Sequence, residues 1–250
     1  MNIGIVGTGH IGATLVKKLS AAGHSVKVAN SRGPETIEAD LLQDGAQPVT
    51  ATEVFEDVDV VILSIPMKVL PEYRELAMGL NDSVVLIDTS NHYPMRDGKL
   101  LEDSKDIEAE WVQESLGRPI VKAFNAIGAP ALAGDGRPDW ATGLIAIPIT
   151  GDREEDKATT ISLINDIGFD AYDAGAITES WRIQPGNPAY CTDLTLDELP
   201  QALANANAER APKLRDIFVE AAYERMTDAA ETNPPADWGV QLSRILYAPK

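Results

Sequence analysis

The stretch that decides the fold is GIVGTGHIG, residues 4–12, where a strand-like run leads directly into a cluster of glycines. The apolar, β-branched residues Ile3–Val6 predict the strand. The next segment, residues 11–23, has apolar side chains four positions apart on one helical face and ends at a glycine. A second apolar run, Ser25–Ala29, follows. These segments together predict a β-α-β unit with a glycine-rich turn between its first strand and its helix.

The glycines of this turn have the spacing found in dinucleotide-binding proteins. Gly7 permits the tight turn, Gly9 lets the backbone approach a diphosphate, and Gly12 allows the helix to pack closely on the strand. The N-terminus of the helix adds free N–H groups and a partial positive charge. A glycine turn without a ligand is the alternative, but the order strand, turn, helix, strand favours a dinucleotide site. The residues expected at the diphosphate are Gly7, Thr8, Gly9, His10, Ile11 and Gly12.

The end of the second strand indicates which dinucleotide binds. NAD-specific sites commonly carry Asp or Glu here to bind the ribose hydroxyls, and this chain has Asn30 instead. Asn30 can hydrogen-bond the ribose without a charge that would repel a 2′-phosphate, while Ser31 and Arg32 can bind the phosphate oxygens. These three residues predict NADP as the cofactor. The alternative is that Arg32 is a solvated turn residue.

The segment that follows this turn is expected to be helical. Gly33 and Pro34 end the strand, and PETIEADL, residues 34–41, is expected to begin a helix with Glu35 in its first turn. If the loop folds back, Thr36 could donate a further hydrogen bond to the phosphate.

Short apolar runs recur along the first part of the chain with helical stretches between them, which is typical of a parallel sheet covered on both faces. A helix is expected at about residues 153–167, and IGFDAYDAG, residues 167–175, could supply a seventh short strand. The pattern predicts an α/β fold, a Rossmann-type doubly wound and mainly parallel sheet. The six main runs are Ile3–Val6, Ser25–Ala29, Val58–Ile65, Val84–Ile87, Ile120–Phe124 and Leu144–Ile149.

The pattern changes after the sheet. We divide the chain into an NADP-binding domain, residues 1–176, and a C-terminal loop and helical extension, residues 177–250. Within the extension, one or two helices are expected, broken near Pro212, and then coil with a short helix. The apolar positions of the longer helix suggest a homodimer contact. These positions are Leu214, Ile217, Phe218 and Ala222, and the last segment contains Pro234, Pro235 and Trp238.

Ligands of open α/β sheets lie outside the carboxyl ends of the strands, so the residues that follow the other strands are further candidates. Ser64, Ile65 and Pro66 end the third predicted strand, and the two apolar residues would press against the cofactor. Asn91 follows the fourth strand, and Asn125 with Ala126 follows the fifth. Both amides could orient a carboxamide or a substrate carbonyl at the same rim, although ordinary turn chemistry explains each asparagine singly.

Composition excludes several classes of partner. The formal net charge of −18 and the pI of about 4.5 argue against nucleic acid or an anionic membrane surface as a partner. The single cysteine, Cys191, allows no internal disulfide, and the start MNIGIVG has no export signal, so a cytoplasmic protein is expected. One cysteine and three scattered histidines give no metal-ligand spacing.

Several motifs together resemble one family. They are GIVGTGHIG, NSRGPET, DTSN-YP, VKAFNAIG, GFD-YDAG and SWR-QPG-PAY. Over about residues 1–190 they are similar to the NADP-dependent oxidoreductases named for coenzyme F-420, whose reference activity is hydride exchange between NADPH and that deazaflavin. The chain is more remotely similar to the cytoplasmic domain of STEAP-type metalloreductases, which pass a hydride from NADPH to a flavin.

The resemblance implies a Rossmann fold, 2′-phosphate recognition at Ser31 and Arg32, the glycine loop at the diphosphate, and Ile65 and Pro66 near the nicotinamide. It implies NADP as cofactor and the deazaflavin F-420 or a flavin as acceptor. The helical segment after Tyr190 departs from the compact deazaflavin reductases, which leaves the acceptor open.

The residues show no clear catalytic acid. His92 and Tyr93 are the only acid candidates near the rim, and Lys122 lies within the fifth strand with either face open to it. Hydride transfer between a nicotinamide and a flavin-like ring needs less from the protein, because the cofactors carry the chemistry. A redox sensor that binds NADP without turnover, and a reductase of small imines or ketones, are the alternatives.

TESWRIQPGNPAY, residues 178–190, joins aromatic rings to an arginine directly after the sheet. Together with Tyr93, its residues Trp181, Arg182 and Tyr190 could form the wall of a substrate pocket, with Arg182 meeting an anionic tail. The alternative is a rigid corner that packs the helical extension onto the sheet, with Trp181 as its anchor.

Overall fold

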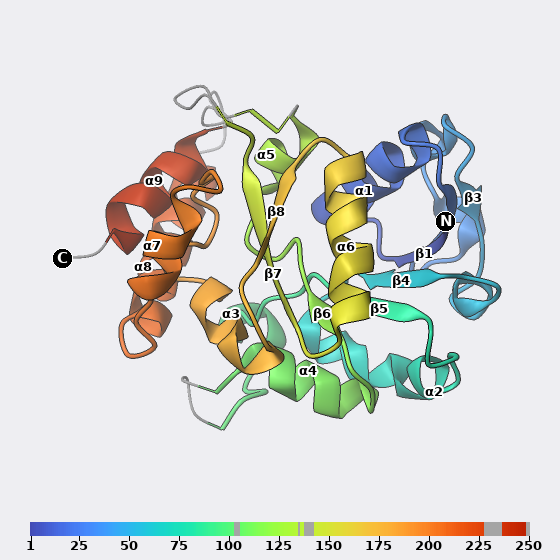
Figure 1. The fold of residues 1–250 in the computed structure, drawn as a ribbon, viewed down its shortest axis with the longest axis horizontal. Coiled ribbons are helices and arrows are strands. Elements are labelled where there is room, and N and C mark those ends of the chain that lie inside the picture. Colours follow the sequence, from blue (N-terminus) through green and yellow to red (C-terminus); the bar gives the residue numbers. More distant parts are fainter. Residues whose placement is uncertain (103–105, 135, 138–142, 228–236, 249–250) are drawn as a thin grey trace.

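A computed structural model describes residues 1–102, 106–134, 136–137, 143–227 and 237–248. Its centre is an eight-stranded sheet with the order β3-β2-β1-β4-β5-β6-β7-β8 (Figure 1). This order and the flanking helices confirm the predicted Rossmann-type α/β fold with a C-terminal helical extension. The strands are β1 (Asn2–Val6), β2 (Ser25–Ala29), β3 (Gln47–Pro48), β4 (Val60–Leu63), β5 (Val85–Asp88), β6 (Val121–Lys122), β7 (Ala146–Gly151) and β8 (Asp170–Asp173).

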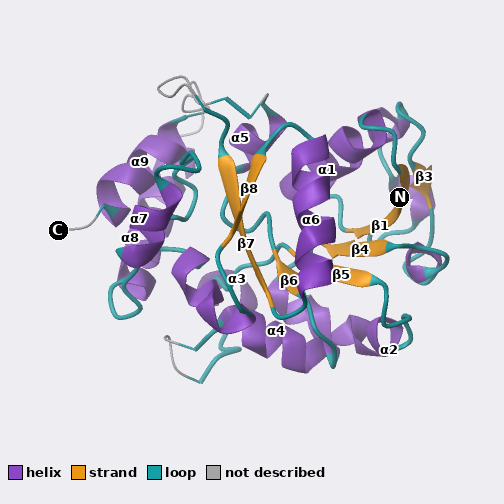
Figure 2. Cartoon of the chain, viewed as in Figure 1, coloured by secondary structure: helices purple, strands orange, loops and turns teal. Residues whose placement is uncertain are grey.

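Helices cover both faces of the sheet (Figure 2). Helix α1 packs Leu15 and Leu19 into one apolar cluster, and α6 adds Leu163 to the same cluster. On the other face, α4 buries Val112 and Leu116 in a second cluster. The sheet is therefore doubly wound, as predicted. The helices are α1 (His10–Ala21), α2 (Arg74–Met78), α3 (Pro94–Asp97), α4 (Glu108–Leu116), α5 (Ala129–Ala133), α6 (Glu154–Asp166), α7 (Leu199–Ala204), α8 (Ala211–Thr227) and α9 (Trp238–Tyr247).

One strand reverses the direction of the sheet. β7 pairs with β6 antiparallel, with Val121 opposite Gly151, and β8 then pairs with β7 in parallel. The amino ends of β7 and β8 consequently lie at the edge where β1 to β6 have their carboxyl ends. The backbone N–H of Ala146, the first residue of β7, donates to the carbonyl of Leu194 at 2.7 Å, which brings the start of the extension to that edge.

The predicted helix in PETIEADL is wrong. Two short 3₁₀ turns, Pro34–Thr36 and Ala39–Leu42, replace it. Between them Ile37 and Glu38 are extended, with ψ of 126° and 135°, and this break turns the Ile37 side chain into the core. Residues 34–42 thus bury Ile37 at an extended step between two short turns, and a helix of the expected eight residues would be too short to be stable alone.

The C-terminal extension forms a third apolar cluster at the end of the molecule away from β3 (Figure 1). The break between its first two helices lies at residues 205–210, and Pro212 stands in the first turn of α8, where a proline needs no N–H partner. Two helices with a break just before Pro212 agree with the prediction of one or two helices broken near that proline. Leu214 and Phe218 pack against the third cluster, whereas Ile217 is exposed. A homodimer through this helix stays a prediction, and Pro234 and Pro235 lie outside the described residues.

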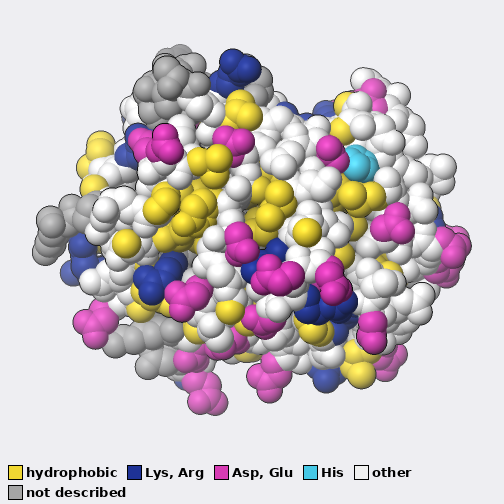
Figure 3. Space-filling view, viewed as in Figure 1, with side chains coloured by type: hydrophobic (Ala, Val, Ile, Leu, Met, Phe, Trp, Pro, Cys, Tyr) yellow, Lys and Arg dark blue, Asp and Glu magenta, His cyan; other side chains and the backbone are white. Residues whose placement is uncertain are grey.

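The surface agrees with the acidic composition. Asp and Glu side chains are spread over the viewed face, with Lys and Arg among them (Figure 3). Among the described residues, no helix is both long enough and apolar enough to cross a membrane.

Candidate functional site

The glycine loop lies at the carboxyl ends of β1 and β4. Gly7 has a φ of +106°, and a Cβ built on it would lie 2.2 Å from the carbonyl oxygen of Ser64. A Cβ on Gly12 would lie 2.1 Å from the carbonyl oxygen of Gly7. Both contacts are with backbone atoms, so side chains there would push α1 away from the sheet. A Cβ on Gly9, by contrast, would meet nothing within 4 Å.

Gly7 and Gly12 are therefore needed for close packing, whereas Gly9 faces open space. Gly9 caps α1 with an extended backbone, and its carbonyl accepts the N–H of Ala13 at 2.8 Å. Thr8 and Ile11 beside it are half-buried, and His10 is exposed. A backbone turn with open space over its middle glycine, at the start of a twelve-residue helix, fits the diphosphate of a dinucleotide.

The loop after β2 is closed by its own side chains. The Asn30 Oδ1 atom accepts the backbone N–H of Arg32 at 2.9 Å, and its Nδ2 atom donates to Thr36 Oγ1 at 2.9 Å. Thr36 Oγ1 in turn donates to the carbonyl of Gly33 at 2.8 Å. Ser31 and Arg32 are exposed at the tip. Asn30 and Thr36, expected to face the ribose and the phosphate, therefore use their polar atoms within the loop in this structure.

The segment after β4 continues the same edge of the sheet. Ser64 Oγ accepts a hydrogen bond from the hydroxyl of Thr89 at 3.2 Å, which joins the ends of β4 and β5. Ile65 and Pro66 are half-buried, so part of their apolar surface is open at the rim. This position agrees with the expected apolar contact for a nicotinamide ring.

The structure brings Asn91 and Asn125 together, as the sequence predicted. Asn91 Nδ2 donates to the Asn125 carbonyl at 3.0 Å, and Asn125 Nδ2 donates to Asn91 Oδ1 at 3.2 Å. Asn125 also donates to the carbonyl of Ile183, and Ala126 accepts the N–H of Cys191 through its carbonyl. Both asparagines are buried, and Asn125 Oδ1 has no partner in the described part of the chain. These contacts link the strand ends to the extension.

Tyr93 and Tyr190 lie beside this amide pair. Their hydroxyl oxygens are 2.7 Å apart, and Asn91 Nδ2 lies 3.4 Å from the Tyr190 hydroxyl. Burial raises the pKa of both tyrosines above the ordinary value, so both remain protonated at neutral pH. Of the two predicted acid candidates, His92 is buried with its Nε2 atom 2.9 Å from the Gly98 carbonyl. Of these two side chains, only the Tyr93 hydroxyl contacts Tyr190, and its raised pKa makes it a weaker acid than a free tyrosine.

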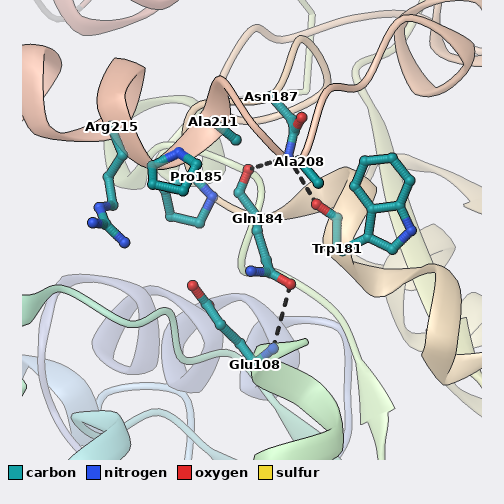
Figure 4. Close-up of a pocket in the computed structure, with 9 residues that line it drawn as sticks. Glu108, Trp181, Gln184, Pro185, Asn187, Ala208, Ala211 and Arg215 are labelled. Carbon is teal, nitrogen blue, oxygen red and sulfur yellow. Dashed lines mark hydrogen bonds between the residues drawn. The ribbon is translucent and has the colours of Figure 1, made fainter. Parts of the chain in front are cut away.

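Trp181 and Arg182 do not join the tyrosines. The Arg182 guanidinium lies 4.4 Å from the Trp181 ring centroid, and its Nε atom donates to Glu179 at 2.6 Å. Arg182 also donates to the carbonyl of Leu203 in α7. Trp181 lies on a separate cavity of only about 20 Å³, shown in Figure 4, which is room for a single water molecule. The contacts thus support the rigid-corner alternative for this pair.

Three carboxylates, which the sequence did not single out, hold the loop that carries Asn91 and Tyr93. Each accepts a backbone N–H of this loop. Because the N–H groups of Ser90, His92 and Tyr93 are fixed in this way, the loop presents both side chains in one geometry. The bonds are Asp88 to Ser90 at 3.0 Å, Glu108 to His92 at 3.0 Å and Asp97 to Tyr93 at 3.1 Å.

Lys122 forms an ion pair with one of these carboxylates. Its Nζ atom lies 2.6 Å from Asp88 Oδ2, and it also donates to the carbonyl of Ser90. Both side chains of the ion pair are buried, at 1% and 0% exposure. The sequence did not decide which face of the sheet Lys122 points to. In the structure its side chain is buried in the interior, where it contacts Asp88 and the Ser90 carbonyl and so holds the loop.

Glu108 is the carboxylate of this group with the most altered acidity. It is buried in the first turn of α4, and Gln184 and Arg215 lie around the small cavity beside it (Figure 4). Burial raises its pKa to about 7, although Lys122, the His92 N–H and Arg215 act in the opposite direction. In the unfolded chain the pKa is near 4.5. The folded state therefore binds this proton more strongly than the unfolded state.

Glu108→Gln is expected to remove a pH dependence of stability. A raised carboxyl pKa lowers the free energy of unfolding as pH rises from about 4.5 to about 7, by about 3 kcal/mol in all. Glutamine can still accept the His92 N–H without carrying a charge. The stability of the variant relative to the wild type should therefore rise as pH increases. Urea unfolding at pH values from 5 to 8 measures this. If the free energy of unfolding varies with pH in the same way in both proteins, the prediction is contradicted. Glu110→Gln, at an exposed carboxylate in the first turn of the same helix, is the control.

Comparisons with known proteins bear on this site. Residues 2–92 match the model of the family described as NADP oxidoreductase, coenzyme F420-dependent. The matched segment contains the glycine loop and the loop after β2. Protein YjhV of Escherichia coli strain K12 is 36% identical over 85 residues, which are 32% of this chain and 62% of that protein. The chain thus spans less than two thirds of this relative.

Two solved structures extend the likeness beyond that segment. The hypothetical protein SMa0349 from Sinorhizobium meliloti is 27% identical with a TM-score of 0.66, over 78% of this chain and 95% of the other. A protein of Arthrobacter sp. FB24, provisionally assigned as an F420-dependent NADP-reductase, is 21% identical with a TM-score of 0.59. The match covers 72% of this chain and 87% of the other. The second shows a shared fold. The resemblance predicted from the motifs is confirmed over residues 2–92.

Proposed function

We propose that this protein is an oxidoreductase that transfers a hydride between NADP(H) and a conjugated acceptor of the deazaflavin or flavin kind. The observation that carries the proposal is the pair of loops at the carboxyl ends of β1 and β2. The first has open space over Gly9, and the second presents Ser31 and Arg32 where a ribose phosphate would lie. Both loops fall in residues 2–92, which match a family of NADP oxidoreductases.

Each part of the cofactor has residues suited to hold it. The N–H groups at the start of α1 would bind the diphosphate, with Gly9 allowing close approach. Ser31 and Arg32 would bind the 2′-phosphate, and no carboxylate follows β2 directly to repel it. Ile65 and Pro66 would lie against the nicotinamide. When bound, the nicotinamide supplies the hydride.

The protein's own part in the reaction is orientation. A ring that accepts a hydride also takes up a proton, and the Tyr93 hydroxyl, whose pKa burial raises, stays a hydrogen-bond donor beside Tyr190 rather than a ready source of that proton. The carboxylate-held loop fixes Tyr93 and Asn91 at the rim. Stacking and orientation of two rings need no covalent step from the protein.

Oxidation of NADPH in the presence of different acceptors tests the proposal. The assay pairs NADPH with F-420, with flavins, with quinones and with small imines and ketones, and it follows the loss of nicotinamide absorbance. Turnover with a deazaflavin or flavin supports the proposal. Turnover with small imines or ketones alone assigns the protein to a different reaction. Tight NADPH binding with no turnover by any acceptor makes it a binding module instead.

Arg32→Ala is expected to weaken NADPH binding about thirtyfold and to leave NADH binding nearly unchanged, because a charged hydrogen bond to phosphate is worth about 2 kcal/mol. Fluorescence titration of the two cofactors against wild type and variant gives both dissociation constants. Arg32→Lys keeps the charge but cannot donate two parallel hydrogen bonds. Its loss of NADPH affinity should therefore lie between that of the wild type and that of Arg32→Ala. Equal losses for NADPH and NADH would contradict the assignment of Arg32 to the phosphate.

A further inference from the structure

Two side chains at the base of the loop at residues 30–36 hold the loop in one conformation. Asn30 and Thr36 stand at opposite ends of the loop and are joined through Asn30 Nδ2 and Thr36 Oγ1 at 2.9 Å. The same asparagine accepts the Arg32 N–H at 2.9 Å, and the same threonine bonds the Gly33 carbonyl at 2.8 Å. Two side chains therefore fix both the middle and the ends of a seven-residue turn.

The residues at the tip are arranged differently. Ser31 and Arg32 are exposed, while Asn30 and Thr36 are half-buried. Within the described residues, no hydrogen bond or ion pair involves the Arg32 guanidinium, so it is available for a ligand. Gly33, next to it, has a φ of +100°, which a glycine adopts without strain. The loop thus consists of a fixed base and a tip with exposed Ser31 and Arg32 side chains, where the Glu35 carboxylate lies against Gly33.

We infer that Asn30 and Thr36 determine cofactor preference as positioning residues, by holding Ser31 and Arg32 in the geometry that receives the 2′-phosphate. The inference rests on the proposed function, because it concerns the NADP site. It differs from a direct ribose contact by Asn30, since the oxygen and one N–H of its amide are engaged in the loop. A loop fixed before the ligand arrives loses less entropy on binding, so its contacts yield more affinity.

Asparagine at position 30 suits this role better than aspartate. A carboxylate could accept both the Arg32 N–H and the Thr36 hydroxyl, so it would keep the loop closed. It would also place a negative charge next to the phosphate position and lose the N–H donated to Thr36. Asn30→Ala therefore changes the geometry of the loop alone, and Asn30→Asp changes the charge at this position.

Thr36→Val tests the positioning role, because valine has nearly the shape of threonine without the hydroxyl. We expect the dissociation constant of NADPH to rise about tenfold and that of NADH to stay within about twofold. Thr36→Ser keeps the hydroxyl and should stay close to wild type for both cofactors. Circular dichroism melting of each variant checks that the fold is intact.

Combination with Arg32→Ala shows whether Thr36 acts through Arg32. If it does, Thr36→Val should weaken NADPH binding far less in the Arg32→Ala protein than in the wild type. An independent effect of the same size in both backgrounds would overturn the inference, as would wild-type NADPH affinity in Thr36→Val.

Position 30 gives the second test. Asn30→Ala opens the loop without adding charge, so NADPH binding should weaken while NADH binding stays unchanged. Asn30→Asp keeps the loop closed and adds charge, so NADPH binding should weaken while NADH binding does not. A large loss of NADH affinity in Asn30→Ala would show a direct ribose contact and overturn the inference.

The outcomes also separate this inference from the proposed function. If the wild-type protein binds neither cofactor, or binds NADH as well as NADPH, the proposed NADP site itself fails. If the wild type prefers NADPH and Arg32→Ala abolishes that preference, the site stands. Unchanged preference in Thr36→Val and Asn30→Ala then overturns the positioning role alone.

Discussion

Replacement of Lys122 by methionine is expected to lower the free energy of unfolding by about 3–5 kcal/mol, because it leaves a buried carboxylate without its partner. The Lys122 Nζ atom is 2.6 Å from Asp88, and both side chains are at most 1% exposed. Methionine fills the space of the lysine stem but provides no charge and no donor. Urea unfolding followed by circular dichroism measures the loss, and a change below about 1 kcal/mol would contradict the prediction.

A matched control separates burial from the loss of a lysine. Lys17 forms an ion pair with Asp40 at 2.7 Å, but these side chains are 48% and 49% exposed. Lys17→Met is therefore expected to cost less than about 1 kcal/mol. Asp88→Asn combined with Lys122→Met removes both charges while keeping an acceptor for the Ser90 N–H, so the double variant should recover much of the stability lost in Lys122→Met.

Gly12→Ala is expected to abolish measurable NADPH binding and to lower the melting temperature. Its Cβ would lie 2.1 Å from the carbonyl oxygen of Gly7, and neither atom belongs to a flexible side chain. The contact can be relieved only if α1 moves away from β1, which displaces the N–H groups proposed to bind the diphosphate. NADPH fluorescence titration and thermal unfolding report the two effects. Wild-type affinity in the variant would exclude the loop as the diphosphate site.

Gly9→Ala distinguishes packing from cofactor approach. Gly9 has an ordinary φ of −70°, and a Cβ there meets nothing within 4 Å. The stability of this variant should equal that of the wild type. Its NADPH affinity should fall more than tenfold if the diphosphate lies over Gly9, since the added methyl group would occupy that space. Wild-type affinity together with wild-type stability would place the diphosphate elsewhere.

The sequence predicted those parts of the molecule that depend on neighbouring residues or on a simple rule of topology. The glycine loop was predictable because Gly7, Gly9 and Gly12 act within one turn. The meeting of Asn91 and Asn125 followed from the rule that adjacent parallel strands end at one edge, and the structure places them in hydrogen-bond contact.

The parts that were missed depend on burial and on long-range contacts. Whether Lys122 faces the rim or the interior could not be decided, because the predicted strand Ile120–Phe124 is apolar on both sides of the lysine and has no polar face to assign it to. Glu108 stands at the start of an amphipathic helix, where an acidic residue is ordinary, and only the fold places it against the His92 N–H. The helix expected in PETIEADL failed because Ile37 is buried in the core.

The Tyr93–Tyr190 bond has a consequence for the order in which the protein is assembled during synthesis. It joins residues 97 positions apart, whereas the glycine loop needs only β1, β2 and the end of β4. Because chains are made from the N-terminus, the glycine loop and the loop after β2 leave the ribosome well before Tyr190 is translated. A nascent chain released between these two points would contain both loops but lack the hydroxyl group that Tyr93 contacts.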